Sequence, residues 1–126
     1  MTIYKSAEDY LERIYMLQLE GKMVRSIDIA NSFNYSRASI SRAINNLKDH
    51  NYITIQNNGI ISLTESGLDI AIKMYNRHKL LTDFFVNIGV PYEIATDDAC
   101  KIEHDLSDET FEIIKKYIDK FNKENQ

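Results

Sequence analysis

The spacing of apolar residues changes near the middle of the chain, and this change limits the folds that the sequence can form. Between residues 26 and 50, apolar side chains recur at intervals of three and four, which predicts helices. From Ile53 to Leu63 they alternate with polar residues around the pair Asn58-Gly59, which favours a tight turn between two strands. The pattern therefore predicts two short helices followed by one β-hairpin.

The two short helices have the spacing of a helix-turn-helix. We expect helices over residues 27–33 and 37–50, capped by Ser26 and Ser36. Residues 34–35 would form the tight turn between them, since asparagine tolerates the left-handed backbone that such a turn requires. The hairpin that follows would then be the wing of a winged helix.

The polar side of the second helix carries hydroxyl, amide and guanidinium groups. Such groups reach the phosphates and base edges of DNA. Some winged helices only mediate protein contacts, but the two arginines on this side favour DNA binding. The candidate DNA-binding residues are Ser36, Arg37, Ser39, Ser41, Arg42 and Asn45.

The charge is unevenly distributed along the chain. The net charge is −4, yet residues 22–63 carry five basic and two acidic side chains, a balance of +3. A basic block inside an acidic protein indicates that one region approaches phosphates. Uneven surface charge without a nucleic-acid partner is the alternative explanation.

Further helices are predicted on both sides of this block. Ser6 would cap a first helix that ends near Leu19, and the last four residues would be frayed. After the hairpin we expect helices from Thr64 to Asn87, from Pro91 to Leu106 and from Ser107 to Asn122, with Thr64 and Ser107 as caps. The predicted fold is mainly α, with a winged-helix DNA-binding domain over residues 1–63 and a helical domain over residues 64–126.

Composition limits the number of domains, the cellular location and the cysteine chemistry that we expect. The 126 residues, 44% of them apolar, suit one compact domain or two small halves that share a core. No export signal or membrane-spanning run is visible, so we expect a cytoplasmic protein with no membrane partner. A single cysteine excludes a disulfide within the chain and leaves metal ligation or thiol chemistry open.

Residues of the metal-binding type occur in three separate segments. Near residue 100, a cysteine is followed three and four positions later by a glutamate and a histidine, so one helical turn could point all three the same way. The candidates are Asp9 and Glu12 near the N-terminus, His78 in the long amphipathic stretch, and Cys100, Glu103 and His104.

Each of these residues also has an ordinary structural interpretation. Asp9 could complete a capping box with Ser6, and Glu12 could be a solvated carboxylate. His78 lies among apolar residues, where an isolated histidine is more often a hydrogen-bonded core residue than a ligand.

Several motifs resemble the diphtheria toxin repressor family of metal-activated transcription regulators. They are Glu8-Asp9-Tyr10-Leu11-Glu12-Arg13-Ile14-Tyr15, the winged helix, Arg77-His78-Lys79-Leu80-Leu81 and Cys100-Lys101-Ile102-Glu103-His104. The resemblance covers nearly the whole chain in order, and it is strongest to the manganese transport regulator branch.

This resemblance implies a ligand set, an assembly and a partner. The family pattern makes Asp9, Glu12, His78, Cys100, Glu103 and His104 the ligands of two adjacent divalent metal ions. It also implies a homodimer, formed mainly by the fifth helix, that presents two winged helices to a palindromic operator in double-stranded DNA. Two such heads occupy successive major grooves when they lie about 34 Å apart.

Cys100 departs from the pattern of the branch. The manganese branch has glutamate at this position, whereas the iron branch has cysteine there but lacks the aspartate at the position of Asp9. A thiolate favours Fe(II), Co(II) or Zn(II), and the carboxylates suit Mn(II) or Fe(II). Fe(II) therefore satisfies both kinds of ligand, with Mn(II) close behind.

The function expected from the sequence is a metal-activated repressor that controls manganese or iron homeostasis. The alternative is a redox-sensing regulator on the same winged helix, with Cys100 as its reactive thiol. An enzyme is not expected, because the chain has no hydrolytic metal motif, glycine-rich phosphate loop or nucleophile elbow.

Overall fold

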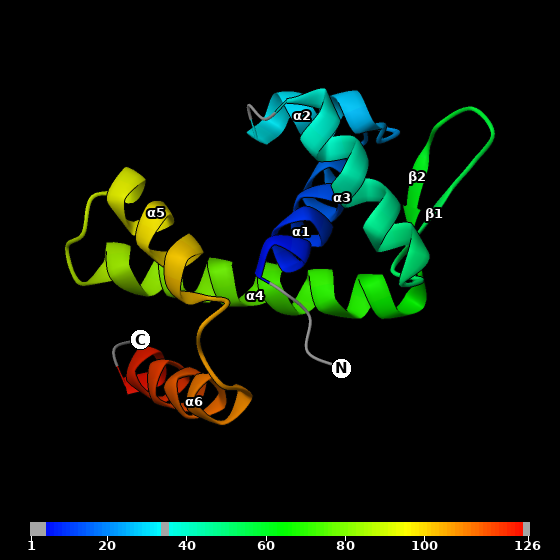
Figure 1. Cartoon of the computed structure of the whole chain (residues 1–126). Helices are drawn as coiled ribbons and strands as arrows, with labels where there is room; N and C mark the ends of the chain where they lie inside the picture. The colour runs from blue at the N-terminus through cyan, green and yellow to red at the C-terminus, as the bar shows by residue number, and fades with distance from the viewer. Residues whose placement is uncertain (1–4, 34–35, 125–126) are drawn as a thin grey trace. The chain divides into compact units, whose positions relative to one another are not determined.

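A computed structural model of the chain describes residues 5–33 and 36–124. The described residues form six helices and one hairpin (Figure 1), so the predicted mainly helical fold with a single wing is confirmed. The elements are α1 (Lys5–Leu19), α2 (Ser26–Phe33), α3 (Arg37–Asp49), β1 (Ile53–Ile55), β2 (Ile61–Leu63), α4 (Glu65–Asn87), α5 (Tyr92–Ile102) and α6 (Asp108–Glu124). None of these helices is both long and apolar enough to cross a membrane.

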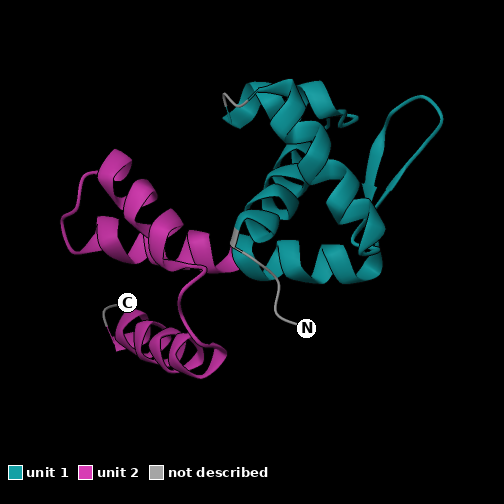
Figure 2. Ribbon diagram, viewed as in Figure 1, with its two compact units in different colours: residues 1–75 teal, residues 76–126 magenta. Residues whose placement is uncertain are grey.

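The chain divides into two compact units (Figure 2). The first unit comprises residues 1–75 and the second comprises residues 76–126, so the division falls inside α4. Within the first unit, Ala71 of α4 is fully buried in the core that α1, α2, α3 and the hairpin build. The first turns of α4 therefore belong to the winged helix.

The core of the first unit consists of apolar side chains at helical spacing. On α3 the buried residues are Ile40, Ile44 and Leu47, as the sequence predicts for the side opposite the polar face. The remaining members of this core are Leu11, Ile14, Leu17, Val24, Ile29, Ala30, Ile53, Ile61 and Ala71.

Three of the predicted caps are confirmed. The Ser36 hydroxyl accepts a hydrogen bond from the Ser39 N–H at 3.2 Å, and the Thr64 hydroxyl accepts one from the Gly67 N–H at 3.2 Å. At α6 the Ser107 hydroxyl accepts from the Thr110 N–H at 3.1 Å. Each bond satisfies a backbone donor that the first turn of a helix leaves open.

Two other predicted caps are wrong. Ser6 lies inside α1, which already includes Lys5, so Asp9 does not complete a capping box from the predicted position. Ser26 is the first residue of α2, because the Asp28 carboxylate accepts a hydrogen bond from the Arg25 N–H at 2.9 Å and so makes Arg25 the cap position.

The predicted hairpin is confirmed. Ile53 pairs with Leu63 and Ile55 with Ile61 in an antiparallel register. Gly59, with φ of 86°, adopts the left-handed backbone that the turn requires and donates its N–H to the Gln56 carbonyl at 2.9 Å.

The predicted helix boundaries near the C-terminus need correction. The helix that was expected to reach Leu106 ends at Ile102, and α6 continues to Glu124. Lys123 and Glu124 are therefore helical instead of frayed, while residues 125–126 and the predicted turn at residues 34–35 lie outside the described part of the chain.

Candidate nucleic-acid interface and metal centre

The exposed face of α3 offers cationic and polar side chains. Arg37, Ser41, Arg42 and Asn45 are all exposed on it. Within residues 5–33 and 36–124, no carboxylate forms an ion pair with either arginine. Both guanidinium groups are therefore available to acceptors outside the unit.

Two of the predicted DNA-binding hydroxyls are already engaged within the chain. Ser36 caps α3, and its hydroxyl also donates to the Ser39 hydroxyl at 3.0 Å. Ser36 is exposed and Ser39 is partly buried. These two residues accordingly stabilise the start of α3, whatever further contacts they make.

Arg25 is a further exposed cation near the wing, outside the sequence-based set of candidate DNA contacts. It is exposed just before α2, and its Nε donates to the Asn58 carbonyl in the wing turn at 3.3 Å. The wing turn, residues 56–59, contains no basic residue of its own. Arg25 brings positive charge to this turn.

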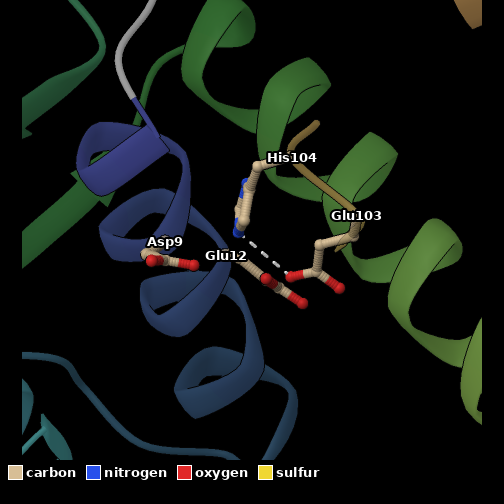
Figure 3. A group of neighbouring side chains, drawn as sticks. All are labelled: Asp9, Glu12, Glu103 and His104. Carbon is tan, nitrogen blue, oxygen red and sulfur yellow. Dashed lines mark ion pairs between the residues drawn. The ribbon is translucent and has the colours of Figure 1, made fainter. Parts of the chain in front are cut away.

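In the second unit, one carboxylate lies between two imidazoles. Glu103 Oε2 is 3.0 Å from His78 Nδ1, and Glu103 Oε1 is 3.2 Å from His104 Nε2 (Figure 3). The Glu103 and His104 side chains have no solvent exposure, and that of His78 is 19% exposed. A carboxylate is stable in such a place only with charged or hydrogen-bonding partners, or with a metal.

Glu103 is the C-cap of α5, with helical φ and ψ of −60° and −29° and an N–H that donates to the Ala99 carbonyl. The expectation that Glu103 shares a helical turn with Cys100 is therefore met by its backbone, whereas His104 belongs to the turn that follows. Cys100 remains on α5 at an exposed position. The Cys100 thiol is thus exposed, whereas the Glu103 carboxylate three residues later is buried.

In the first unit, α1 carries two carboxylates three residues apart. Figure 3 shows Asp9 and Glu12 on this helix. Glu12 is 6% exposed, so it is not the solvated carboxylate that its alternative interpretation required.

The available donor atoms suit a divalent metal. Asp9, Glu12, Glu103 and His104 can each offer one ligand atom, a carboxylate oxygen or an imidazole nitrogen. Carboxylate oxygens with imidazole nitrogens are the donors that Mn(II) and Fe(II) accept. The residues present therefore fit a bound transition metal.

A winged helix, followed by a helical unit with a buried carboxylate between two imidazoles, is the arrangement of a metal-dependent DNA-binding regulator. The chain belongs to the iron-dependent repressor family: residues 2–59 match the N-terminal DNA-binding domain, and residues 64–125 match the metal-binding and dimerisation domain. These matches confirm the family that the motifs indicated, and they make the protein a transcriptional repressor and not an enzyme.

Curated relatives agree with this assignment. An uncharacterized helix-turn-helix transcriptional regulator of Methanocaldococcus jannaschii is 34% identical over 119 residues, which cover 93% of this chain and 95% of the relative. The transcriptional regulator MntR of Shouchella clausii is 35% identical over 121 residues, covering 96% of this chain and 84% of the relative.

Solved structures share the fold. The manganese regulator SloR has a TM-score of 0.80 at 26% identity, over 94% of this chain and 55% of the SloR chain. A manganese-dependent transcriptional repressor in complex with manganese has a TM-score of 0.78 at 31% identity, over 86% of this chain and 50% of its own. The chain therefore spans about half the length of these two proteins.

Proposed function

We propose that this protein represses genes of manganese or iron homeostasis by binding a palindromic operator as a homodimer when Fe(II) or Mn(II) is bound. The observation that carries this proposal is the buried Glu103 carboxylate between His78 and His104, in the region matched to a metal-binding and dimerisation domain. Manganese-dependent relatives support the choice of metal.

The proposed ligands come from both units of the chain. Two ions per subunit would be held, with some ligands bridging them, by Asp9, Glu12, His78, Cys100, Glu103 and His104. A bound divalent cation would supply the positive charge that lets carboxylates from α1 share one centre with those of the second unit. The ligands on α1 would thereby restrain the DNA-reading unit, so that less conformational freedom is lost when DNA binds.

The DNA-contacting residues are proposed from α3. Ser36, Arg37, Ser39, Ser41, Arg42 and Asn45 would face the operator. Two copies of the chain would present this helix to successive major grooves about 34 Å apart. The direct test is operator selection from genomic fragments by anaerobic protein, with and without Mn(II) or Fe(II). Equal recovery of the same fragments in both conditions would contradict metal activation.

Replacing Arg37 or Arg42 by alanine should weaken operator binding. A lost phosphate contact should reduce the slope of log affinity against log salt concentration by about one unit. A lost base contact should instead cost about 1 to 3 kcal/mol of binding free energy and relax specificity at one position. Fluorescence anisotropy over a range of salt concentrations measures both effects. Lys120→Ala, an exposed change on α6, is the control; if both arginine variants match it, α3 does not contact DNA.

Replacing Cys100 by glutamate should shift activation toward Mn(II). A hard carboxylate takes the place of a soft thiolate, so the ratio of Mn(II) to Co(II) activation should rise even if total affinity falls. Anaerobic titration of the wild type with Co(II) should also give a thiolate charge-transfer band that Cys100→Ser lacks. Absence of that band at saturating Co(II), together with an unchanged Mn(II) preference of Cys100→Glu, would remove Cys100 from the ligand set.

The exposed position of Cys100 favours a second candidate function, thiol-based redox sensing. A reactive thiol must be accessible, and this one is. In that case a reductant would restore DNA binding to oxidised protein without added metal, and Cys100→Ser would not respond to oxidant. If Cys100→Ser binds the operator with the metal dependence of the wild type but no longer responds to oxidant, Cys100 serves redox sensing and is not a metal ligand.

A further inference from the structure

Arg77 of α4 is a buried cation in the second unit, only 3% exposed. Its Nη1 donates to the Glu103 carbonyl at 3.0 Å and to the Leu106 carbonyl at 2.8 Å. Its Nη2 donates to Asp108 Oδ1 at 2.6 Å. A single guanidinium thus serves three acceptors that lie 26 to 31 residues further along the chain.

Both carbonyls lie in the segment between α5 and α6. Glu103 is the first residue after α5, and Leu106 lies two residues before the start of α6. Backbone carbonyls at a helix end have no helical donor and need another partner. Arg77 supplies that partner to Glu103 and also binds the Leu106 carbonyl, and so holds the main chain that carries the Glu103 and His104 side chains.

The same guanidinium also contacts the start of α6. Asp108 is the first residue of this helix, and the ring of Phe111, one turn later, has its centre 4.9 Å from Arg77 Cζ. Phe111 is buried at 8% exposure, so its ring is packed and not merely close to the cation. A charge-assisted pair and a cation–π contact therefore join Arg77 to α6.

We propose that Arg77 is a positioning residue that holds the turn containing Glu103 and the first turn of α6 together, so that the two segments open and close as one unit. Occupancy of the proposed metal ligands would then reach α6 through Arg77. Because α6 lies within residues 64–125, which match a metal-binding and dimerisation domain, metal binding would in this way influence dimerisation. The effect of metal on α6 rests on the proposed metal function. The joining of the turn to α6 by Arg77 does not, because these contacts exist without metal.

Lysine cannot replace arginine in this role. Its ammonium is a single point, whereas the planar guanidinium presents several donors in a fixed fork that can reach both carbonyls and the carboxylate. Arg77→Lys keeps the buried charge but should separate the two segments. Asp108→Asn is a milder variant, because Asp108 is 73% exposed and the change leaves the turn carbonyls bound.

Hydrogen exchange of the full chain, with and without Mn(II), tests the proposal. In wild type without metal, the amides of residues 104–106 and 109–111 should exchange at matching rates, and Mn(II) should slow both segments. In Arg77→Lys the rates should diverge by about 10-fold or more, and Mn(II) should slow residues 104–106 alone. Asp108→Asn should show the same divergence to a smaller degree, and Asp105→Asn, an exposed change in the same turn, should behave as wild type.

Metal affinity gives the second measurement. Changing a residue that orients a ligand lowers metal affinity by about 10- to 100-fold, and Arg77→Lys should fall in this range by chelator competition. Matching exchange in Arg77→Lys, with or without Mn(II), would overturn the proposal. A wild type that binds no Mn(II) or Fe(II) would instead overturn the proposed function, and the metal-free exchange rates would still decide whether Arg77 joins the two segments.

Discussion

Glu103→Gln is expected to abolish metal-dependent operator binding while leaving a folded protein. The amide has nearly the shape of the carboxylate but no negative charge, so it cannot serve His78 and His104 or a divalent cation in the same way. Loss of a residue that only supports a metal ligand lowers affinity by about 10- to 100-fold. Loss of the central carboxylate itself should reach at least the upper end of that range.

The measurement is Mn(II) affinity by chelator competition, followed by operator anisotropy at a fixed Mn(II) concentration. Circular dichroism of the metal-free protein checks that the helices persist. Glu93→Gln, an exposed change in the first turn of α5, makes the same chemical substitution without touching the imidazoles. Retention of full metal-dependent binding by Glu103→Gln would show that the carboxylate between the imidazoles is structural.

Gly67→Ala is expected to destabilise the winged-helix unit strongly. A Cβ at this position would lie 2.0 Å from the Tyr52 carbonyl oxygen, and a backbone atom cannot move aside as a flexible side chain can. The helix cannot shift freely either, because the Thr64 N–H donates to that same carbonyl at 3.0 Å and the Thr64 hydroxyl donates to the Asn51 carbonyl at 2.7 Å.

Two opposing effects decide whether Gly67→Ala raises or lowers the free energy of unfolding. Alanine in a helix is favoured over glycine by about 1 kcal/mol. Forcing extra volume into a packed site costs about 1 to 3 kcal/mol, and more when backbone must move. Since a 2.0 Å approach lies far inside van der Waals contact, the steric term should win, and the free energy of unfolding should fall by about 2 kcal/mol or more.

Urea unfolding of the metal-free protein measures this change. Asp69→Ala, at an exposed position two residues later on α4, introduces the same side chain without the clash and should change stability by less than about 0.5 kcal/mol. If Gly67→Ala proved as stable as Asp69→Ala, the close approach of α4 to Tyr52 would be wrong.

Features that depend on neighbours in sequence were predictable. The caps at Ser36, Thr64 and Ser107 each bind an N–H three residues ahead, so residue type and spacing indicated them, although the same argument placed caps wrongly at Ser6 and Ser26. The hairpin was predictable for the same reason, because Asn58-Gly59 supplies its own turn between alternating strands.

The sequence offered candidate metal ligands by residue type and spacing, but it did not indicate their environments. Spacing suggested that Cys100 and Glu103 point the same way, yet one is exposed and the other has no exposure at all. Because the backbone of Glu103 stays helical, this difference comes from the neighbours of each side chain: Glu103 lies between His78 and His104.

The sequence by itself determined the winged helix, the polar face of α3 and the kinds of metal-type residue present, because these follow from residue type and spacing within one or two turns of chain. The tertiary structure decided what binds the main chain after α5, which carboxylate is buried and why residue 67 must be glycine. Each of these depends on a partner far along the chain: Arg77 for the carbonyl of Glu103, and Tyr52 for the open side of Gly67. Contacts across such separations leave no periodic signal, since either partner alone is compatible with many local structures.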